Sequence, residues 1–343
     1  MRGSLKAGIL ACLVFLGLSG LLWGYARNSG LPEQTGTTGQ TEIQTETQTQ
    51  ATQETQQTSL PEPSQAPTLP DPAFSMASSH VFVYDTAQGK LLFTAGDPDA
   101  RIAPASLTKL FSAYVALQHL KPDAVITAGE EVTWIDPDSS VAFIYKGQKV
   151  TVELCVKGML MQSGNDAAYI LAVAAGRAIQ GNPSLSAKAA LSVFVGKMNE
   201  TALLLGLENT HFVNPDGIDA PGHYTSLQDL TAISVLALEN PLIRQCAAAV
   251  RETVTYISGE TVNWKNTNEL LHPESEFYCE AACGLKTGST TGAGKCLISA
   301  FRQEEGYLII GTLGSPEEDD RYRDTLNLYN HYTGQPADGT PAS

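Results

Sequence analysis

The chain has 343 residues, of which 43% are hydrophobic, enough for a large globular domain with a real core. Its formal net charge of −15 argues against a nucleic-acid-binding protein, since a phosphate-binding face needs clustered Lys and Arg. We therefore expect no nucleic-acid partner, and the acidity by itself names no other partner.

The chain opens on a segment typical of a membrane anchor. Arg2 and Lys6 precede an uncharged apolar run at 7–26, which is long enough to cross a bilayer. We predict that residues 1–27 form a signal anchor in the cytoplasmic membrane, with the following chain on the extracytoplasmic face. The alternative is a secreted protein, because the small residues that end at Ala26 suit a signal peptidase.

Residues 28–75 are predicted to form a disordered linker. Gln, Thr and Glu dominate its first part and a Pro-rich run follows, so it has little apolar surface to bury. One domain is expected at 76–333. Residues 334–343, which contain Gly and Pro, are expected to form a disordered tail.

The domain is predicted to be α+β. Alternating segments at 80–86 and 90–96 indicate an opening hairpin, and Pro104 begins a helix with apolar residues at helical spacing. Helical periodicity then predominates at 152–163, 165–179, 186–206 and 226–238. The strand pattern returns at 251–258, 283–289, 295–302 and 306–314, and a final helix is expected at 320–332. This order predicts an antiparallel sheet built from both chain ends, with helices on its faces and a mostly helical section inserted.

Five of the six cysteines fall in the predicted domain, at Cys155, Cys246, Cys279, Cys283 and Cys296. An odd number in an exported domain leaves at least one thiol unpaired or bonded to another chain. Cys279 and Cys283 could form a metal pair, but no His or second Cys pair stands at ligand spacing. Buried free thiols or one disulfide are favoured, and no metal is expected.

Three short motifs stand out, and each alone has an ordinary structural interpretation. Ser106 and Lys109 lie one helical turn apart and could belong to a solvated helix face. Ser163 and Asn165 stand at a break between helices, where a small polar residue commonly caps a helix. The Lys-Thr-Gly run at 286–288 ends a predicted strand and could be a hairpin turn.

Together and in this order, Ser-x-x-Lys, Ser-x-Asn and Lys-Thr-Gly resemble the motifs of the penicillin-recognising serine enzymes. The surrounding sequence at 147–168, 205–219 and 284–297 is similar to the low-molecular-mass D-alanyl-D-alanine carboxypeptidases of peptidase family S11. The resemblance covers about 76–333 and implies the penicillin-binding protein and β-lactamase fold. It also implies a peptidoglycan stem peptide ending in D-Ala-D-Ala as substrate, β-lactams as covalent inhibitors, and no cofactor. Many members carry a second β domain and a C-terminal membrane helix, and here we expect the N-terminal segment to attach the protein instead.

The first two motifs are predicted to be catalytic. Ser106 would be the nucleophile and Lys109 its base, which requires the lysine to be neutral. Burial and the positive charge of Lys286 would both lower the pKa of Lys109. Ser163 can pass a proton to the leaving amine, and Asn165 can hold Lys109 and the substrate amide.

Substrate binding is predicted at the third motif. Lys286 and Thr287, followed by Gly288, combine an ammonium with a hydroxyl donor and make a compact site for a free carboxylate. The strand that carries them would be an edge strand, which can pair with the extended substrate backbone.

The family resemblance adds two further features. The backbone N–H groups of Ser106 and Ser289 would form the oxyanion hole. A more distant arginine would help to bind the substrate carboxylate; Arg321 is the candidate, and Arg323 is its competitor.

Two rival functions stay open at this point. Class A β-lactamases share the three motifs, but this chain lacks their Glu-x-x-Leu-Asn pattern after the Ser-x-Asn helix. A slowly acylated receptor or an inactive peptidoglycan-binding module is the other rival, although Ser106 and Lys109 are both retained. The sequence also does not set the ratio of hydrolysis to transpeptidation, because an amine can replace water as the acyl acceptor.

Overall fold

The computed structural model describes residues 70–334. The predicted signal anchor at 1–27 lies outside these residues, as do most of the predicted linker and nearly all of the predicted tail. Within residues 70–334, no helix is long and apolar enough to cross a bilayer.

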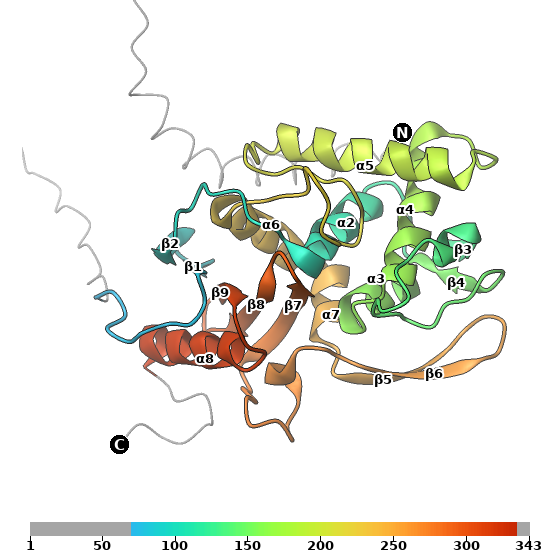
Figure 1. Ribbon diagram of the computed structural model, residues 1–343. Helices are drawn as coiled ribbons and strands as arrows, with labels where there is room; N and C mark the ends of the chain where they lie inside the picture. Colours follow the sequence, from blue (N-terminus) through green and yellow to red (C-terminus); the bar gives the residue numbers. More distant parts are fainter. Residues whose placement is uncertain (1–69, 335–343) are drawn as a thin grey trace, which may run out of the picture. The chain divides into compact units, whose positions relative to one another are not determined.

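A five-stranded antiparallel sheet forms the centre of the described chain. It consists of β1 (His80–Asp85), β2 (Lys90–Ala95), β7 (Ala282–Thr290), β8 (Gly294–Arg302) and β9 (Tyr307–Ser315). The strand order is β2-β1-β9-β8-β7 (Figure 1). The strand β1 pairs directly with β9, with Val81 opposite Thr312. The sheet is therefore built from both ends of the domain, as the sequence predicts, and β7 is an edge strand.

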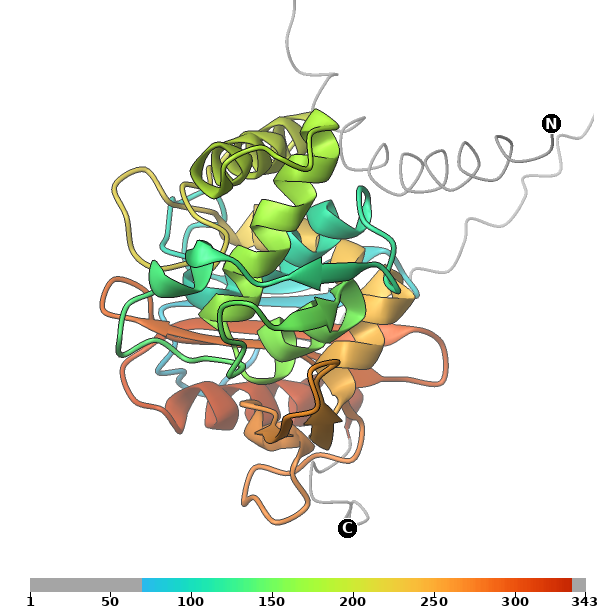
Figure 2. The ribbon, with the colours of Figure 1, turned by 90° about the vertical axis from the view of Figure 1, so that its right-hand side faces the viewer.

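Helices cover both faces of this sheet. The helix α8 (Asp320–Thr333) packs on one face against β8 and β9, where Tyr322, Leu328 and Tyr329 are buried. The other face carries a larger helical layer, in which α6 (Leu227–Glu239) contacts β1 and α7 (Pro241–Ala248) contacts β7. Figure 2 shows the sheet between α8 and this larger layer.

The inserted section is mostly helical, as predicted. Its remaining elements are η1 (Ala105–Leu107), α2 (Thr108–Leu117), β3 (Val125–Thr127), η2 (Glu130–Thr133), β4 (Lys149–Thr151), α3 (Val152–Met161), α4 (Asn165–Gln180) and α5 (Ala187–Leu204). The helix α2 lies among α3, α4, α5 and α6. Because it is surrounded, its polar residues Thr108, Lys109 and Ser112 are buried together with the predicted apolar stripe. The Ser106–Lys109 face is therefore not a solvated helix face.

One predicted strand lies outside the main sheet. The segment at 251–258 contains β5 (Arg251–Thr255), which pairs with β6 (Thr261–Lys265), a strand that the sequence analysis did not identify. In this two-stranded ribbon only Val254 and Trp264 are buried. The exposed, alternating residues explain why the ribbon lies apart from the central sheet. The short helix η3 (Glu269–Leu271) follows it.

Packing of the described chain begins before β1. Phe74 and Met76 pack against the core on the α8 side of the sheet. The backbone N–H of Ser78 donates to Asp324 Oδ2 at 2.7 Å, and the Ser78 hydroxyl donates to the same oxygen at 2.6 Å. These hydrogen bonds connect the segment that precedes β1 to α8.

All five cysteines of the domain are free and buried. Burial raises the pKa of Cys283 and of Cys296 to about 11, so both are protonated, inert thiols at neutral pH. Within residues 70–334, no group of three His, Cys, Asp or Glu side chains is placed to hold a metal ion. The structure thus has the buried free thiols that the sequence favoured, without the one disulfide that was their alternative.

Candidate active site

Ser106 and Lys109 meet at the start of the central helix. Ser106 lies in the turn η1 that leads into α2, and Lys109 lies in the first turn of α2. The Lys109 Nζ donates to Ser106 Oγ at 2.7 Å. Lys109 is fully buried, whereas Ser106 is partly exposed. The hydroxyl is therefore partly accessible from the surface, while the amine is shielded from water.

Two glycines from distant segments approach the main chain around Ser106. Ala105 has a left-handed φ of 48°, and Gly217 has a φ of 91°. A Cβ on Gly217 would stand 1.8 Å from the Ala105 carbonyl oxygen, so only glycine allows this contact. A Cβ on Gly288 of β7 would stand 3.1 Å from the Ser106 backbone nitrogen. The edge strand thus runs directly beside the serine.

Lys109 has a second acceptor. Its Nζ donates to the main-chain carbonyl of Asp216 at 2.7 Å. Burial lowers the pKa of Lys109 to about 8, and the negative charges of Asp216 and Asp166 oppose that shift. With this pKa, about a tenth of the amine is neutral at pH 7, compared with well under a thousandth at the ordinary value. Burial thus gives Lys109 the lowered pKa that the sequence predicts, whereas the charge interaction between the two lysines lowers the pKa of Lys286.

Ser163 and Asn165 lie at the break between α3 and α4, as predicted. Ser163 is buried and has a left-handed φ of 57°, while Asn165 is the first residue of α4. Asn165 Nδ2 donates to Ser139 Oγ at 2.9 Å. No hydrogen bond between Asn165 and Lys109 occurs in the described part of the chain. There, the acceptors of the Lys109 amine are Ser106 Oγ and the Asp216 carbonyl.

Asp166 anchors the segment that covers this break. Its Oδ1 accepts from the backbone N–H of Ala142 at 2.8 Å, and its Oδ2 accepts from that of Ile144 at 2.9 Å. Between them, Phe143 has a left-handed φ of 63° and is exposed. Burial raises the pKa of Asp166, and the backbone hydrogen bonds partly compensate. The start of α4 and the segment at 139–144 therefore form one fixed unit.

Lys286 and Thr287 lie on the edge strand β7. Lys286 is 1% exposed and its Nζ donates to the Thr287 carbonyl at 2.9 Å. Burial, followed by the charges of Lys109 and Arg321, lowers the pKa of Lys286 well below its ordinary value. The hydroxyl oxygens of Thr287 and Thr267 are 2.6 Å apart. The third motif therefore carries a buried amine close enough to Lys109 for their charges to interact.

Arg321 lies beside this strand, and Arg323 does not. Arg321 Nη1 donates to the Gly288 carbonyl at 3.2 Å and to Ser289 Oγ at 3.4 Å, while Glu318 pairs with its Nη2. The side chain of Arg323 is 57% exposed and pairs with Asp319. Of the two candidate arginines, only Arg321 contacts the residues that follow Lys286 and Thr287.

The segment at 205–219 resembles the family in sequence, but none of its residues is among the predicted site residues. The structure shows that Asp216 and Gly217 of this segment touch Lys109 and Ala105. Asp219 accepts from Thr290 Oγ1 and from the Gly292 N–H, each at 2.7 Å, and so ties the segment to the end of β7. The Asn-Pro-Asp-Gly turn was the available signal, because such turns place glycine at positive φ.

Comparison with known proteins supports the same family. The sequence profile of Peptidase_S11, D-alanyl-D-alanine carboxypeptidase, matches residues 65–317. A D-alanyl-D-alanine carboxypeptidase of Streptomyces sp. strain K15 is 35% identical over 260 residues, covering 73% of this chain and 85% of that protein. The D-alanyl-D-alanine carboxypeptidase DacC of Escherichia coli strain K12 is 32% identical over 254 residues. That match covers 71% of this chain but 58% of DacC, so the chain spans little more than half of this relative's length.

A solved structure agrees with the sequence matches. The crystal structure of the Streptomyces K15 DD-transpeptidase aligns with a TM-score of 0.67 and 30% identity, covering 75% of this chain and 97% of that one. The predicted fold is thereby confirmed. The matched residues include the Ser106 turn, the Ser163 break and the edge strand β7. The chain therefore belongs to the D-alanyl-D-alanine carboxypeptidase family, peptidase family S11, and is a serine-type carboxypeptidase.

Proposed function

We propose that this protein removes the terminal D-alanine from peptidoglycan stem pentapeptides through an acyl-enzyme on Ser106. One observation carries the assignment of the nucleophile: the 2.7 Å hydrogen bond between the buried Lys109 amine and the Ser106 hydroxyl. A serine hydroxyl is a weak nucleophile until a neighbouring base takes its proton. The lowered pKa of Lys109 supports that role near neutral pH.

The proposed reaction has two steps. Ser106 Oγ attacks the D-Ala–D-Ala carbonyl and passes its proton to Lys109, while the N–H groups of Ser106 and Ser289 hold the oxyanion. The peptide C–N bond then breaks, and Ser163 relays the proton held by Lys109 to the leaving amine of D-alanine, which leaves Lys109 neutral again. Water, activated by Lys109, finally hydrolyses the ester and regenerates Ser106. Asn165 would hold the substrate amide from the start of α4.

The terminal carboxylate of the substrate is proposed to bind beside β7. Lys286 and Thr287 supply an ammonium and a hydroxyl. Arg321 adds positive charge through its contacts with Gly288 and Ser289. Because β7 is an edge strand, its free backbone groups can pair with the extended peptide.

The cellular setting is also a proposal. The segment at 1–27 would anchor the protein in the cytoplasmic membrane, and the linker at 28–75 would hold the domain on the extracytoplasmic face. If the segment is cleaved near Ala26, the protein is secreted. β-Lactams are proposed to acylate Ser106, since they present a reactive carbonyl and a carboxylate to the same groups.

Transpeptidation is a second candidate activity. The solved relative from Streptomyces K15 is described as a DD-transpeptidase, and a relative from the same strain is described as a carboxypeptidase. An amine acceptor would attack the same acyl-enzyme in place of water. β-Lactamase activity is disfavoured because the Glu-x-x-Leu-Asn pattern is missing from the sequence.

The test is release of D-alanine by the full chain from a peptide ending in D-Ala-D-Ala, with Ser106→Ala as control. We expect release by the wild type and none by the variant, and addition of glycine as acceptor measures transpeptidation. No release by the wild type, together with retention of the peptide by Ser106→Ala, would instead identify a binding module. Rapid penicillin turnover without a long-lived adduct on Ser106 would identify a β-lactamase.

A further inference from the structure

A cavity lies apart from the Ser106 site. It has a volume of about 490 Å³, within the range of small-molecule sites, and residues of β3, η2 and α4 line it. Most of its wall is apolar, with Leu120, Ile126, Ile170 and Val173 among its lining residues. None of the residues proposed to act in catalysis or substrate binding lines this cavity.

One carboxylate of the cavity wall has an unsatisfied oxygen. Glu131 is 1% exposed, and its Oε1 accepts from the Gly129 N–H at 2.6 Å. Its Oε2 is buried and has no hydrogen-bond partner among residues 70–334. Burying a carboxylate oxygen without a hydrogen bond costs free energy. A ligand that donates a hydrogen bond to Glu131 Oε2 would remove this cost.

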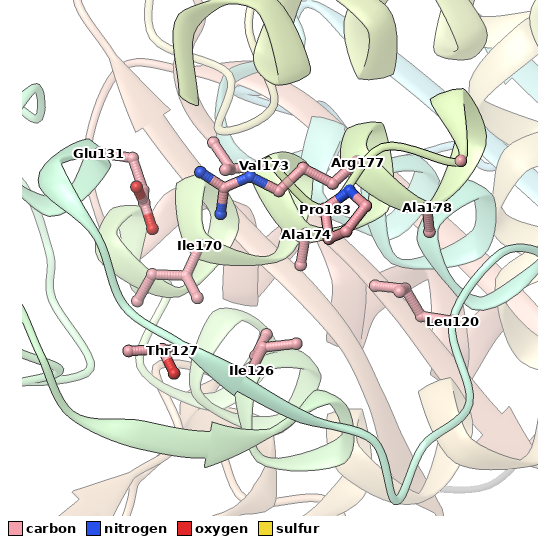
Figure 3. A pocket seen from close by; sticks show the side chains of 11 residues that line it. Leu120, Ile126, Thr127, Glu131, Ile170, Val173, Ala174, Arg177, Ala178 and Pro183 are labelled. Atoms are coloured by element: carbon pink, nitrogen blue, oxygen red, sulfur yellow. The ribbon is translucent and has the colours of Figure 1, made fainter. Parts of the chain in front are cut away.

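A guanidinium faces that carboxylate across the cavity. Arg177 Nε donates to the Leu185 carbonyl at 3.0 Å, which orients the planar group. In the described part of the chain, no ion pair joins Arg177 to Glu131. Figure 3 shows the terminal nitrogens of Arg177 directed toward Glu131, with Ile170, Ile126 and Thr127 below the two charged groups. The unpaired carboxylate oxygen of Glu131 and the guanidinium N–H donors of Arg177 thus lie near each other, beside apolar side chains of the cavity wall.

We propose that this cavity binds an apolar α-amino acid in its zwitterionic form. The ammonium group would donate to Glu131 Oε2, and the carboxylate would accept from the terminal nitrogens of Arg177. The apolar wall would cover the side chain. Because the cavity is far larger than an alanine side chain needs, a branched or longer side chain such as that of leucine fits it better.

Calorimetric titration of the full chain in detergent tests this assignment with D-leucine, L-leucine and two analogues. We expect saturable binding of at least one leucine enantiomer, with one site per chain. Leucinamide lacks the carboxylate and N-acetyl-leucine lacks the ammonium, so each should bind at least tenfold more weakly. Ser106→Ala should bind leucine as the wild type does, which separates this site from the proposed catalytic function.

Three cavity variants and one control variant localise the binding. Glu131→Gln and Arg177→Gln should each weaken leucine binding at least tenfold, and Arg177→Gln should leave the weak binding of leucinamide unchanged. Ala174→Phe fills the cavity from α4, keeps both charges, and should abolish leucine binding while D-alanine release stays intact. Lys188→Gln removes an exposed charge of α5 outside the cavity and should bind leucine like the wild type.

Several results would overturn the proposal. One is failure of both leucine enantiomers to bind the wild type, which is expected if Glu131 and Arg177 simply pair with each other in solution. Another is leucine binding that Ala174→Phe leaves unchanged, since that variant tests the cavity even where Glu131→Gln does not fold. D-Alanine release is measured separately, so its failure tests the proposed function and not this site.

Discussion

The amine of Lys109 lies 2.7 Å from the main-chain carbonyl oxygen of Asp216, a residue 107 positions later in the chain. The side chain of the same aspartate is 2% exposed, and its Oδ1 has no hydrogen-bond partner in residues 70–334. Asp216 therefore orients the Lys109 amine through its carbonyl, while its carboxylate opposes the effect of burial on the pKa of Lys109.

The rate of Ser106 acylation should rise with pH and level off above about 8. The pKa of Lys109 is lowered to about 8, and the lysine acts as a base only when it is neutral. Below this value it is protonated and inactive, so the rate falls about tenfold for each unit of decreasing pH. The second-order rate constant for acylation by a fluorescent penicillin, measured from pH 5 to 10, gives this pH profile. A rate that keeps rising past pH 10 would show that Lys109 titrates as an ordinary lysine.

Asp216→Asn should shift the rise in acylation rate to lower pH. The negative charge of Asp216 raises the pKa of Lys109, so its removal favours the neutral amine. The main-chain carbonyl that orients the amine is kept. We expect acylation at pH 6 to increase roughly 2–5-fold, measured as above. Asp123→Asn, an exposed control, should leave the profile unchanged; a shift to higher pH in Asp216→Asn would contradict the proposed electrostatic role.

Gly217→Ala should be strongly destabilising and should impair acylation. The new Cβ would lie 1.8 Å from the Ala105 carbonyl oxygen, so the backbone beside Ser106 must move. We expect a loss of about 3 kcal/mol or more in the free energy of unfolding, measured by urea denaturation.

Gly222→Ala provides the matched control for that variant. Gly222 has a similar φ of 84°, but the nearest atom to its Cβ would be 3.8 Å away. It should cost about 1 kcal/mol from backbone strain alone and leave acylation near the wild-type rate. Equal losses in the two variants would mean that the contact with Ala105 is unimportant.

Arg321→Leu should lower kcat/KM for a D-Ala-D-Ala peptide by roughly 10–100-fold. The guanidinium contacts Gly288 and Ser289 next to the proposed carboxylate site, where a buried cation assists anion binding. Arg323→Leu removes an exposed arginine from the same helix and should stay within about twofold of the wild type. The pair of variants decides between the two candidates, and equal effects would reject Arg321.

The five thiols of the domain should be unreactive while it is folded. All are buried, and burial raises the pKa of Cys246 to about 12 and that of Cys283 to about 11. A thiol reagent such as DTNB should label them on the timescale of unfolding and rapidly in guanidinium chloride. Reductant should leave the melting temperature unchanged. A lower melting temperature in reductant would reveal a disulfide.

Much of the fold was predictable because its elements are strongly patterned. The opening hairpin, the break before Asn165 and the last three strands follow from local periodicity and from breakers in the sequence. The ribbon formed by β5 and β6 is less predictable from the sequence. Its exposed alternating residues have the strand pattern, but that pattern does not say which strands pair.

The pairing of Ser106 with Lys109 could be foreseen from the sequence, since residues three apart on a helix face the same way. The expected role of Lys109 required its burial, but the residues beside it could not show that burial, because it results from the helices that surround α2. The carbonyl of Asp216, the approach of Gly288 to Ser106 and the position of Arg321 are likewise contacts between distant segments. Local sequence thus determined which groups are available for the chemistry. Long-range packing determined their separations and the desolvation that lowers the pKa of Lys109.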